Sequence, residues 1–136
     1  MPAGELKATV RRVVEGAYNK GNLDALNELY AADFVYRRPP LPDITGLQAY
    51  KQAIADVRSS FSDVELTFNE IIVEGETIAT RWKFQGTHIG QSPTIPVPST
   101  GKQVRITGAS VTHAVTGKAV EEWNHAGWLD FFQQLG

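Results

Sequence analysis

The sequence contains no cysteine, which excludes disulfide bonds and zinc sites built on thiolates. It has no long hydrophobic run either, whereas a helix that spans a bilayer needs roughly 20 consecutive apolar residues. The first residues lack the basic and apolar blocks of a secretory signal. We therefore expect a cytoplasmic protein that makes no contact with a membrane.

Clustered positive charge is also missing. Lysine and arginine total 13 residues against 15 acidic ones, and they gather no further than the pairs Arg11-Arg12 and Arg37-Arg38. Nucleic-acid-binding proteins present a basic surface, so we expect no nucleic-acid partner. The three histidines show neither His-x-His nor His-Glu-x-x-His spacing, and we predict no metal site.

What remains is a chain of ordinary globular composition, with 42% hydrophobic and 21% charged residues. A length of 136 residues supports one hydrophobic core and is too short for two. We therefore predict a single domain over residues 1–136 with a single site.

The N-terminal part shows the hydrophobic periodicity of three helices. The first is predicted to end before Gly21, which suits a C-terminal cap. Asn22 is predicted to cap a second, shorter helix, and Thr45 with Gln48 forms a capping box for a third. Residues 33–37 between the last two helices form a predicted short strand, ended by prolines. The apolar stripes are Leu6, Val10, Val13, Val14 and Ala17, then Leu23, Leu26, Leu29 and Tyr30, then Leu47, Tyr50, Ile54, Val57 and Phe61.

After the third helix the hydrophobic period changes to two, which is the period of strands. Residues 64–73 and 78–85 are predicted strands joined by a turn at Gly75, and residues 103–114 form another. The proline-containing segment 90–101 is predicted to be a loop able to cover a pocket mouth. Helices followed by a meandering antiparallel sheet define an α+β fold.

The connection near Gly117 decides which side chains of the last two strands share a face. A three-residue loop ending at this glycine places His113 on one face with Glu121. A two-residue loop instead places His113 with Glu122. We favour the three-residue loop, because glycine in third place suits a bulged turn.

In the favoured register, one face of the sheet gathers ionisable groups beside an aromatic wall. It carries Arg105, His113, Glu121, Trp123 and His125. Burial and neighbouring charge can move the pKa of a histidine or glutamate towards neutrality, which suits acid-base chemistry. A structural interpretation stays open, in which Glu121 pairs with Arg105 and the histidines only line the pocket or its rim.

At these residues the sequence resembles the SnoaL-like polyketide cyclases, within the nuclear transport factor two (NTF2) and ketosteroid isomerase superfamily. The resemblance covers nearly the whole chain and rests on the order and spacing of short stretches. They are Ala-Tyr-Asn-Lys-Gly-Asn-Leu-Asp at 17–24, Gly-Thr-His-Ile-Gly at 86–90, Thr-Gly-Lys at 100–102, Gly-Lys-Ala-Val-Glu-Glu-Trp-Asn at 117–124 and Gln-Gln-Leu-Gly at 133–136.

The resemblance implies a cone-shaped NTF2-like barrel, in which helices wrapped on a curved antiparallel sheet enclose a largely apolar pocket. It also implies a homo-oligomer, as a dimer or higher, and a cofactor-free reaction on a small hydrophobic carbonyl compound. In the cyclases a histidine on the penultimate strand and an aspartate on the last strand move the protons. His113 matches the histidine, whereas Gly127 stands where the aspartate is expected.

Glycine cannot move a proton, so three functions stay open. The first is a lyase or isomerase in which His125 replaces the aspartate and forms a dyad with His113, oriented by Glu121. His125 lies two residues before Gly127, hence on the same face. The second is a non-catalytic protein that binds a small hydrophobic ligand. The third is an epoxide hydrolase, for which the sequence offers no obvious acid pair.

Further residues are predicted around the pocket. The predicted ligand contacts are Tyr18, Tyr36, Trp82, His88, Trp123 and Gly127. For His88 the alternative is that it anchors the proline-containing loop. The pair Arg37-Arg38 could bind an acidic substrate or remain a solvated surface pair. Val104 and Ile106 lie on the face opposite His113 and, taken as outward-facing, indicate an oligomer interface.

Overall fold

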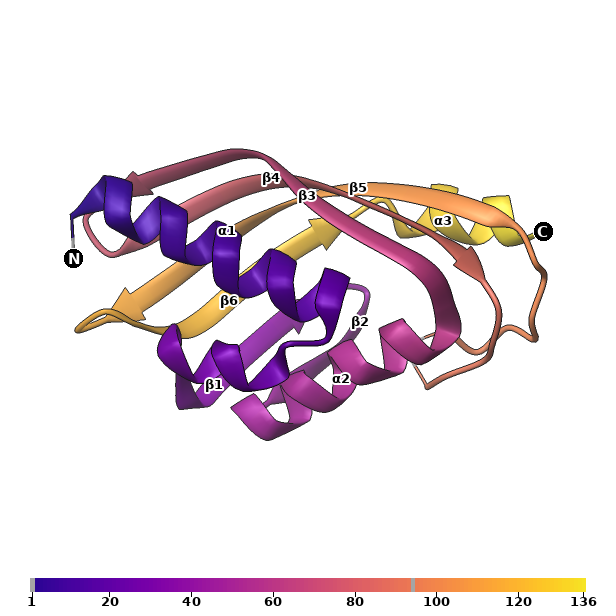
Figure 1. Cartoon of the computed structure of the whole chain (residues 1–136), viewed down its shortest axis with the longest axis horizontal. Helices are drawn as coiled ribbons and strands as arrows, with labels where there is room; N and C mark the ends of the chain where they lie inside the picture. The colour runs from indigo at the N-terminus through magenta and orange to yellow at the C-terminus, as the bar shows by residue number, and fades with distance from the viewer. Residues whose placement is uncertain (1, 94) are drawn as a thin grey trace.

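The structure is a computed structural model that describes residues 2–93 and 95–136. Helices come first in these residues and most strands follow (Figure 1). The elements are α1 (Ala3–Lys20), a short 3-10 helix η1 (Leu23–Glu28), β1 (Tyr30–Arg38), β2 (Leu41–Thr45), α2 (Leu47–Ser60), β3 (Phe61–Glu74), β4 (Thr77–His88), β5 (Gln103–Val115), β6 (Lys118–Ala126) and α3 (Trp128–Leu135). Among the described residues, none of the helices is both long and apolar enough to cross a membrane.

Helix α1 follows its predicted stripe, and every residue of that stripe is buried. The helix ends at Gly21, whose φ is 77° and whose N–H donates to the carbonyl oxygen of Ala17 at 3.1 Å. Glycine adopts this left-handed conformation without strain, so the predicted C-terminal cap is confirmed.

The next two helices differ from their predictions at the ends. Tyr30 belongs to β1, so the second helix is only the 3-10 turn η1. Neither η1 nor α2 has the predicted side-chain cap. Thr45 pairs with Val35 in the β1–β2 hairpin instead, and α2 begins after Gly46. The cap prediction was wrong because Thr45 already forms part of a strand.

The strands form one sheet in the order β2-β1-β6-β5-β4-β3. Strands β3 to β6 make the predicted antiparallel meander, whereas β1 joins β6 in parallel. Strand β2 was predicted to be a loop because of its prolines. It lies at the sheet edge, where the missing N–H of Pro42 removes no bond from the interior of the sheet.

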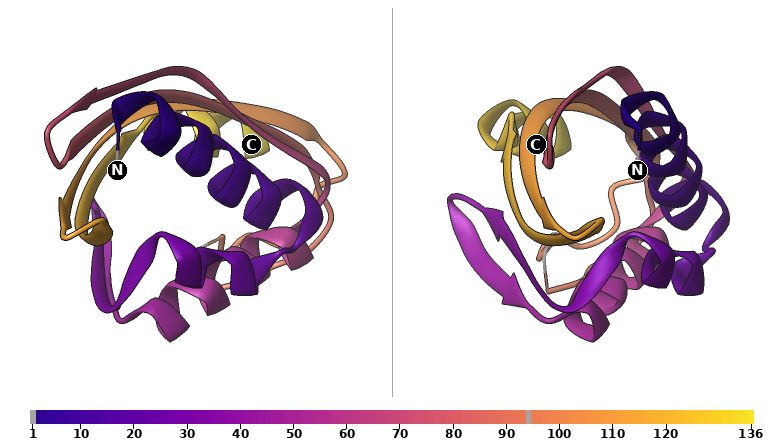
Figure 2. Two further views of the ribbon diagram at one scale, coloured as in Figure 1. Left: turned by 60° about the vertical axis from the view of Figure 1, so that its left-hand side comes forward. Right: turned by 90° about the vertical axis from the view of Figure 1, so that its left-hand side faces the viewer.

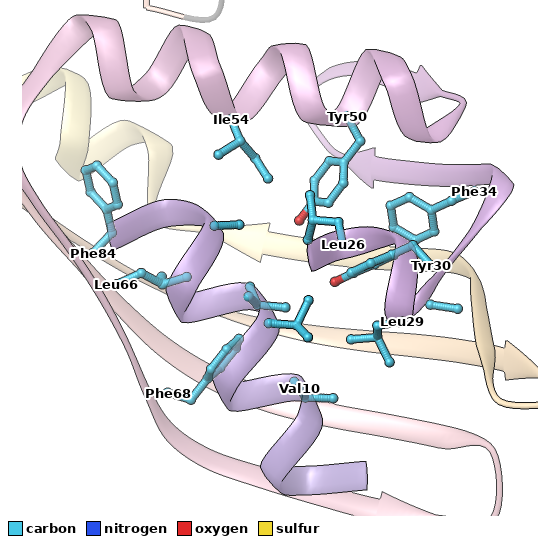
Figure 3. Packing of buried hydrophobic residues seen from close by; sticks show 14 of the residues in the cluster. Val10, Leu26, Leu29, Tyr30, Phe34, Tyr50, Ile54, Leu66, Phe68 and Phe84 are labelled. Atoms are coloured by element: carbon cyan, nitrogen blue, oxygen red, sulfur yellow. The ribbon is translucent and has the colours of Figure 1, made fainter. Parts of the chain in front are cut away.

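The sheet bends into an open arc, and α1 and α2 lie across its open side (Figure 2). Side chains of the helices and of the concave face meet between them, with Tyr30, Phe34 and Tyr50 packed close together (Figure 3). The ring centroids of Tyr30 and Phe34 are 4.6 Å apart, and those of Phe34 and Tyr50 are 5.1 Å apart. The predicted cone-shaped α+β fold is confirmed, except that the sheet does not close into a barrel.

Gly16 offers a stabilising substitution in α1. An added Cβ would have only Asn22 Nδ2 nearby, at an ordinary 3.7 Å. Alanine loses less backbone entropy than glycine when a helix forms, so Gly16→Ala should raise the free energy of unfolding by roughly 0.5–1 kcal/mol. Urea denaturation checks this expectation. An unchanged or lower midpoint would mean that the helix interior does not tolerate the methyl group.

Candidate functional site

The turn between β5 and β6 has two residues rather than the predicted three. Thr116 and Gly117 form it with φ values of 50° and 79°, which suits a tight hairpin with two left-handed positions. A bulge then shifts the register, so that His113 still pairs with Glu121. The predicted turn is therefore wrong, but the predicted grouping of His113 with Glu121 on one face is correct.

That face points away from the interior of the cone. The Trp123 side chain is 42% exposed, and His113 and His125 are also exposed. The cavity is lined by the alternate residues of both strands, such as Thr112 and Glu122. The prediction that the face of His113, Glu121, Trp123 and His125 forms the pocket wall was therefore wrong.

The two histidines of the predicted dyad are also far apart. His125 pairs with Ala109 of β5, four residues from His113 on the same strand. At about 3.3 Å per residue this separation is roughly 13 Å, which is beyond hydrogen-bonding reach. His125 stacks on Trp123 instead, with ring centroids 6.5 Å apart. A joint role of the two histidines in proton transfer stays a prediction that this geometry does not support.

Glu121 belongs to a surface ion-pair cluster with Arg37. Arg37 Nε donates to Glu121 Oε2 at 2.8 Å, and Arg37 Nη1 donates to Asp43 Oδ2 at 2.7 Å. The hydrogen bond from Arg37 lowers the pKa of Glu121, because it favours the ionised carboxylate. Arg37 also lies 5.2 Å from the centre of the Trp123 ring. Arg105 was the predicted alternative partner of Glu121. Its backbone N–H donates to Gln134 Oε1, and its carbonyl oxygen accepts a hydrogen bond from Gln134 Nε2.

A cavity of about 120 Å³ lies inside the cone, between the helices and the concave face of the sheet. This space is roughly ten times what one buried water needs. Its walls are mostly apolar and aromatic. They come from Val10, Val14, Tyr18, Leu29, Tyr30, Tyr36, Arg38, Tyr50, Ala53, Val57, Phe61, Leu66, Phe68, Ile78, Thr80, Trp82, Phe84, Ile95, Ile106, Ser110, Thr112, Ala119, Glu122, Asn124, Ala126, Trp128 and Phe131.

Glu122 supplies a carboxyl group to this apolar space. Its side chain comes from β6 opposite Thr112 of β5, and the residue is only 6% exposed. Burial disfavours the charged form and raises the pKa of Glu122 to about 7, although hydrogen bonds with Asn124 and Thr112 act in the other direction. A carboxyl group with this pKa is present in both protonation states near neutral pH, so it can take or give a proton.

Asn124 connects Glu122 to two aromatic side chains of the cavity wall. Its Nδ2 donates to Glu122 Oε2 at 3.1 Å and to the hydroxyl oxygen of Tyr36 at 3.0 Å. Its Oδ1 accepts a hydrogen bond from Trp82 Nε1 at 3.1 Å. These bonds fix the amide and orient one carboxylate oxygen of Glu122.

Four tyrosines bring their hydroxyl groups to the same part of the cavity. All four line the cavity, and the ring of Tyr50 lies 4.8 Å from that of Tyr36 and 5.5 Å from that of Tyr30, between the ring centroids. Burial raises the pKa of Tyr18 to about 12 and the pKa values of the other three well above their ordinary value. All four are therefore neutral hydrogen-bond donors at physiological pH. Figure 3 shows that the hydroxyls of Tyr30 and Tyr50 point into the interior.

The other predicted ligand contacts divide into two groups. Tyr18, Tyr36 and Trp82 line the cavity as expected. His88, Trp123 and Gly127 lie outside the set of cavity-lining residues. Trp123 is on the outer face. Gly127 immediately precedes α3, and its N–H donates to the carbonyl oxygen of Thr107 at 3.0 Å.

His88 anchors the loop that follows β4, as the alternative prediction proposed. Its Nδ1 lies 3.0 Å from Thr100 Oγ1 and accepts a hydrogen bond from the Thr100 backbone N–H at 3.3 Å. Its backbone N–H donates to the carbonyl oxygen of Lys102 at 2.8 Å. The ring is fully buried against Phe61, so His88 holds both ends of the loop together.

Val104 and Ile106 were taken as outward-facing and as an indication of an oligomer. Both are buried, and Ile106 lines the cavity, so this interpretation was wrong. The large exposed apolar side chains of the last two strands are Val111, Val115 and Trp123, on the other face. A homo-oligomer stays a prediction.

The predicted site residues did not include Glu122 and Asn124, nor Tyr30 and Tyr50, which were predicted only as members of buried helical stripes. Arg38 was predicted only as half of a pair that could bind an acidic substrate or remain solvated. The alternation that places Val104 and Ile106 inside also places Glu122 and Asn124 inside, so the signal was present in the sequence. Among residues 2–93 and 95–136, no group of three or more His, Asp and Glu side chains is arranged to hold a metal ion.

The raised pKa of Glu122 makes stability depend on pH. The folded protein binds this proton more tightly than the unfolded chain, whose carboxyl has an ordinary pKa of 4.5. The stabilisation is therefore complete below about pH 4.5 and is lost as the pH rises to about 7. We compare the free energies of unfolding of Glu122→Gln and wild type at two pH values. The difference, variant minus wild type, should be about 3 kcal/mol larger at pH 8 than at pH 4.5. Urea denaturation at both pH values measures the change, and Glu121→Gln should show no such gain.

A curved sheet and helices that together enclose an apolar cavity define the class of small α+β cones with an internal cavity. TsrD from Streptomyces laurentii superposes on this chain with a TM-score of 0.88 and 20% sequence identity, covering 100% of this chain and 98% of its own. A candidate SnoaL-like polyketide cyclase from Jannaschia sp. CCS1 gives a TM-score of 0.85 and 17% identity over 97% and 92% of the two chains. At identities this low, the superpositions establish a shared fold and nothing further.

Residues 8–135 match the SnoaL-like polyketide cyclase family, and the chain belongs to that family. IdmH from Streptomyces antibioticus, described as a candidate polyketide cyclase, is 26% identical with a TM-score of 0.79, covering 97% of this chain and 99% of its own. No curated protein gives a significant match. The family predicted from the sequence is therefore confirmed.

Proposed function

We propose that this protein catalyses cofactor-independent proton transfer on a small hydrophobic carbonyl compound, leading to aldol cyclisation or isomerisation. The observation that carries the proposal is Glu122, a buried carboxyl group with a pKa of about 7 in an apolar cavity. Membership of the SnoaL-like polyketide cyclase family supports the same class of reaction for this protein.

In the proposed reaction, the Glu122 carboxylate takes a proton from the carbon next to the carbonyl group. The C–H electron pair becomes the C=C bond of an enolate, and negative charge moves to the carbonyl oxygen. A tyrosine hydroxyl of the cavity donates a hydrogen bond to that oxygen, which stabilises the charge as it develops. In an isomerisation, protonated Glu122 returns the proton to another carbon. In an aldol closure, the enolate carbon attacks a second carbonyl carbon and Glu122 protonates the resulting alkoxide.

The cavity walls favour this chemistry in two further ways. Apolar and aromatic side chains bind a hydrophobic substrate and exclude water, which strengthens each hydrogen bond to the reacting oxygen. Asn124 holds one oxygen of Glu122, so that the carboxylate is oriented before the substrate arrives.

Exchange of hydrogen for deuterium in 2-tetralone tests the proposal. This apolar ketone has acidic hydrogens beside its carbonyl group, and NMR in D₂O follows their loss. We expect the protein to accelerate the exchange over buffer, with a rate that rises with pH through about 7 as Glu122 ionises. If the protein binds 2-tetralone without accelerating exchange, the cavity serves binding alone and the catalytic proposal is overturned.

A further inference from the structure

The adjacent residues Arg37 and Arg38 occupy opposite faces of β1. Side chains alternate along a strand, so Tyr36 and Arg38 point into the cone while Arg37 points outward. Arg37 is engaged in the surface cluster with Glu121 and Asp43. Arg38 is partly buried and lines the cavity. Among the cavity-lining side chains of the described chain, Arg38 carries the positive charge and Glu122 carries the carboxyl group.

Arg38 is held in this position by the hairpin that follows it. Its Nε donates to the carbonyl oxygen of Pro42 at 3.1 Å. Burial lowers the pKa of Arg38, but a guanidinium stays protonated throughout the physiological range. A permanent positive charge is therefore maintained beside an apolar cavity, where its interaction with an anion is stronger than in water.

Arg38 and Glu122 act on the same two tyrosines from different positions. The charge of Arg38 lowers the pKa values of Tyr18 and Tyr36, and the charge of Glu122 raises them. The two tyrosines line the same cavity as Arg38 and Glu122. A ligand that bridges this part of the cavity meets a cation at one position and a proton-transferring carboxyl group at the other.

We propose that the ligand of this cavity is a hydrophobic carboxylic acid whose carboxylate binds Arg38 while its apolar body lies against the aromatic wall. Guanidinium and carboxylate match in geometry and can form two parallel charge-assisted hydrogen bonds. Resting on the proposed function, the inference narrows its substrate to a keto acid, with the carboxylate at Arg38 and the acidic C–H near Glu122. A neutral ligand would not form these charge-assisted bonds.

Calorimetric titration with two matched probes tests the inference. 2-Naphthoate carries the carboxylate, and 2-naphthamide has nearly the same shape without the charge. At pH 6 Glu122 is mostly protonated, so it does not repel the anion. We expect wild type to bind 2-naphthoate at least tenfold more tightly than 2-naphthamide. Arg38→Gln should weaken 2-naphthoate binding by roughly 10- to 100-fold and change 2-naphthamide binding by less than about twofold.

Arg37→Gln is the matched control, because it removes an identical charge from the adjacent residue on the outer face. It should leave both affinities unchanged. The inference is overturned if wild type does not prefer 2-naphthoate, a result that needs no variant to fold. It is also overturned if Arg38→Gln weakens both probes alike, which would indicate a structural role.

The result is independent of the catalytic test. Glu122→Gln should keep the Arg38-dependent binding of 2-naphthoate even though it loses hydrogen exchange in 2-tetralone. Selective 2-naphthoate binding without any exchange would overturn the proposed catalysis and uphold the anion site. Exchange without selectivity for 2-naphthoate would uphold the proposed catalysis and overturn the anion site.

Discussion

Glu122→Gln is expected to lower the rate of hydrogen exchange in 2-tetralone by about 10²- to 10⁴-fold. Loss of a general base typically costs this factor, and glutamine cannot accept the proton. The amide has nearly the same size as the carboxyl group, and its oxygen can still accept the hydrogen bond from Asn124, so the cavity should keep its shape. NMR in D₂O at pH 8 gives the rate, because the wild-type carboxyl group is then mostly ionised. Binding of 2-naphthamide should stay within about threefold of wild type.

Glu121→Gln makes the matched control, since it is the same substitution one residue earlier in β6 on the outer face. Glu121 is bonded to Arg37 and lies outside the cavity wall, so its loss should leave the exchange rate unchanged. His113→Ala and His125→Ala should also leave the exchange rate of 2-tetralone unchanged. A large loss in either histidine variant, with full activity in Glu122→Gln, would restore the histidine dyad and contradict the proposal made for Glu122.

The order of elements could be predicted from the sequence because their signals are local. The stripe of α1 and its glycine cap, and the period of two in β3, β4 and β5, need no knowledge of the remaining chain. The exceptions depend on distant partners. Thr45 has the chemistry of a helix cap, but it pairs with Val35 across the hairpin. Pro42 indicates a loop, yet it lies in an edge strand, which tolerates proline.

The site was assigned to the wrong face of the sheet for a different reason. A histidine and a glutamate on one face were given more weight than the apolar pair Val104 and Ile106 on the other. Burial of apolar side chains is the larger effect, and both of these are in the interior. The inner face was difficult to identify as such because its far end carries polar residues, including Thr112 and Glu122. A polar pocket wall resembles a solvent-exposed strand face in the sequence.

The tyrosine cluster could not be predicted from the sequence by periodicity alone. Tyr18 comes from α1, Tyr30 and Tyr36 from β1, and Tyr50 from α2. Each is compatible with an ordinary core position, and only the packing of these elements brings their hydroxyl groups together. The same holds for Arg38, which the sequence presents as half of a charged pair. The alternation of β1 is what separates it from Arg37 and places it in the cavity wall.

Gly108 allows one indole ring to lie over the strand beside it. Gly108 of β5 is the cross-strand partner of Trp82 of β4. A Cβ built on Gly108 would lie 2.6 Å from Cε2 of the Trp82 ring and 2.7 Å from the carbonyl oxygen of His125. The ring therefore covers the glycine, as aromatic residues often do across a strand pair. In this position its Nε1 reaches Asn124, which in turn orients Glu122.

Gly108→Ala should therefore lower the free energy of unfolding by about 1–3 kcal/mol, because an aromatic ring and a backbone carbonyl must both move to admit the methyl group. Displacement of the Trp82 ring also removes the hydrogen bond that fixes Asn124, so the 2-tetralone exchange rate should fall in the protein that remains folded. Urea denaturation and NMR measure the two effects. Gly16→Ala adds the same methyl group where only Asn22 is nearby and should stabilise the protein instead. A Gly108→Ala variant with wild-type stability and exchange rate would show that neither the ring position nor its bond to Asn124 matters to the site.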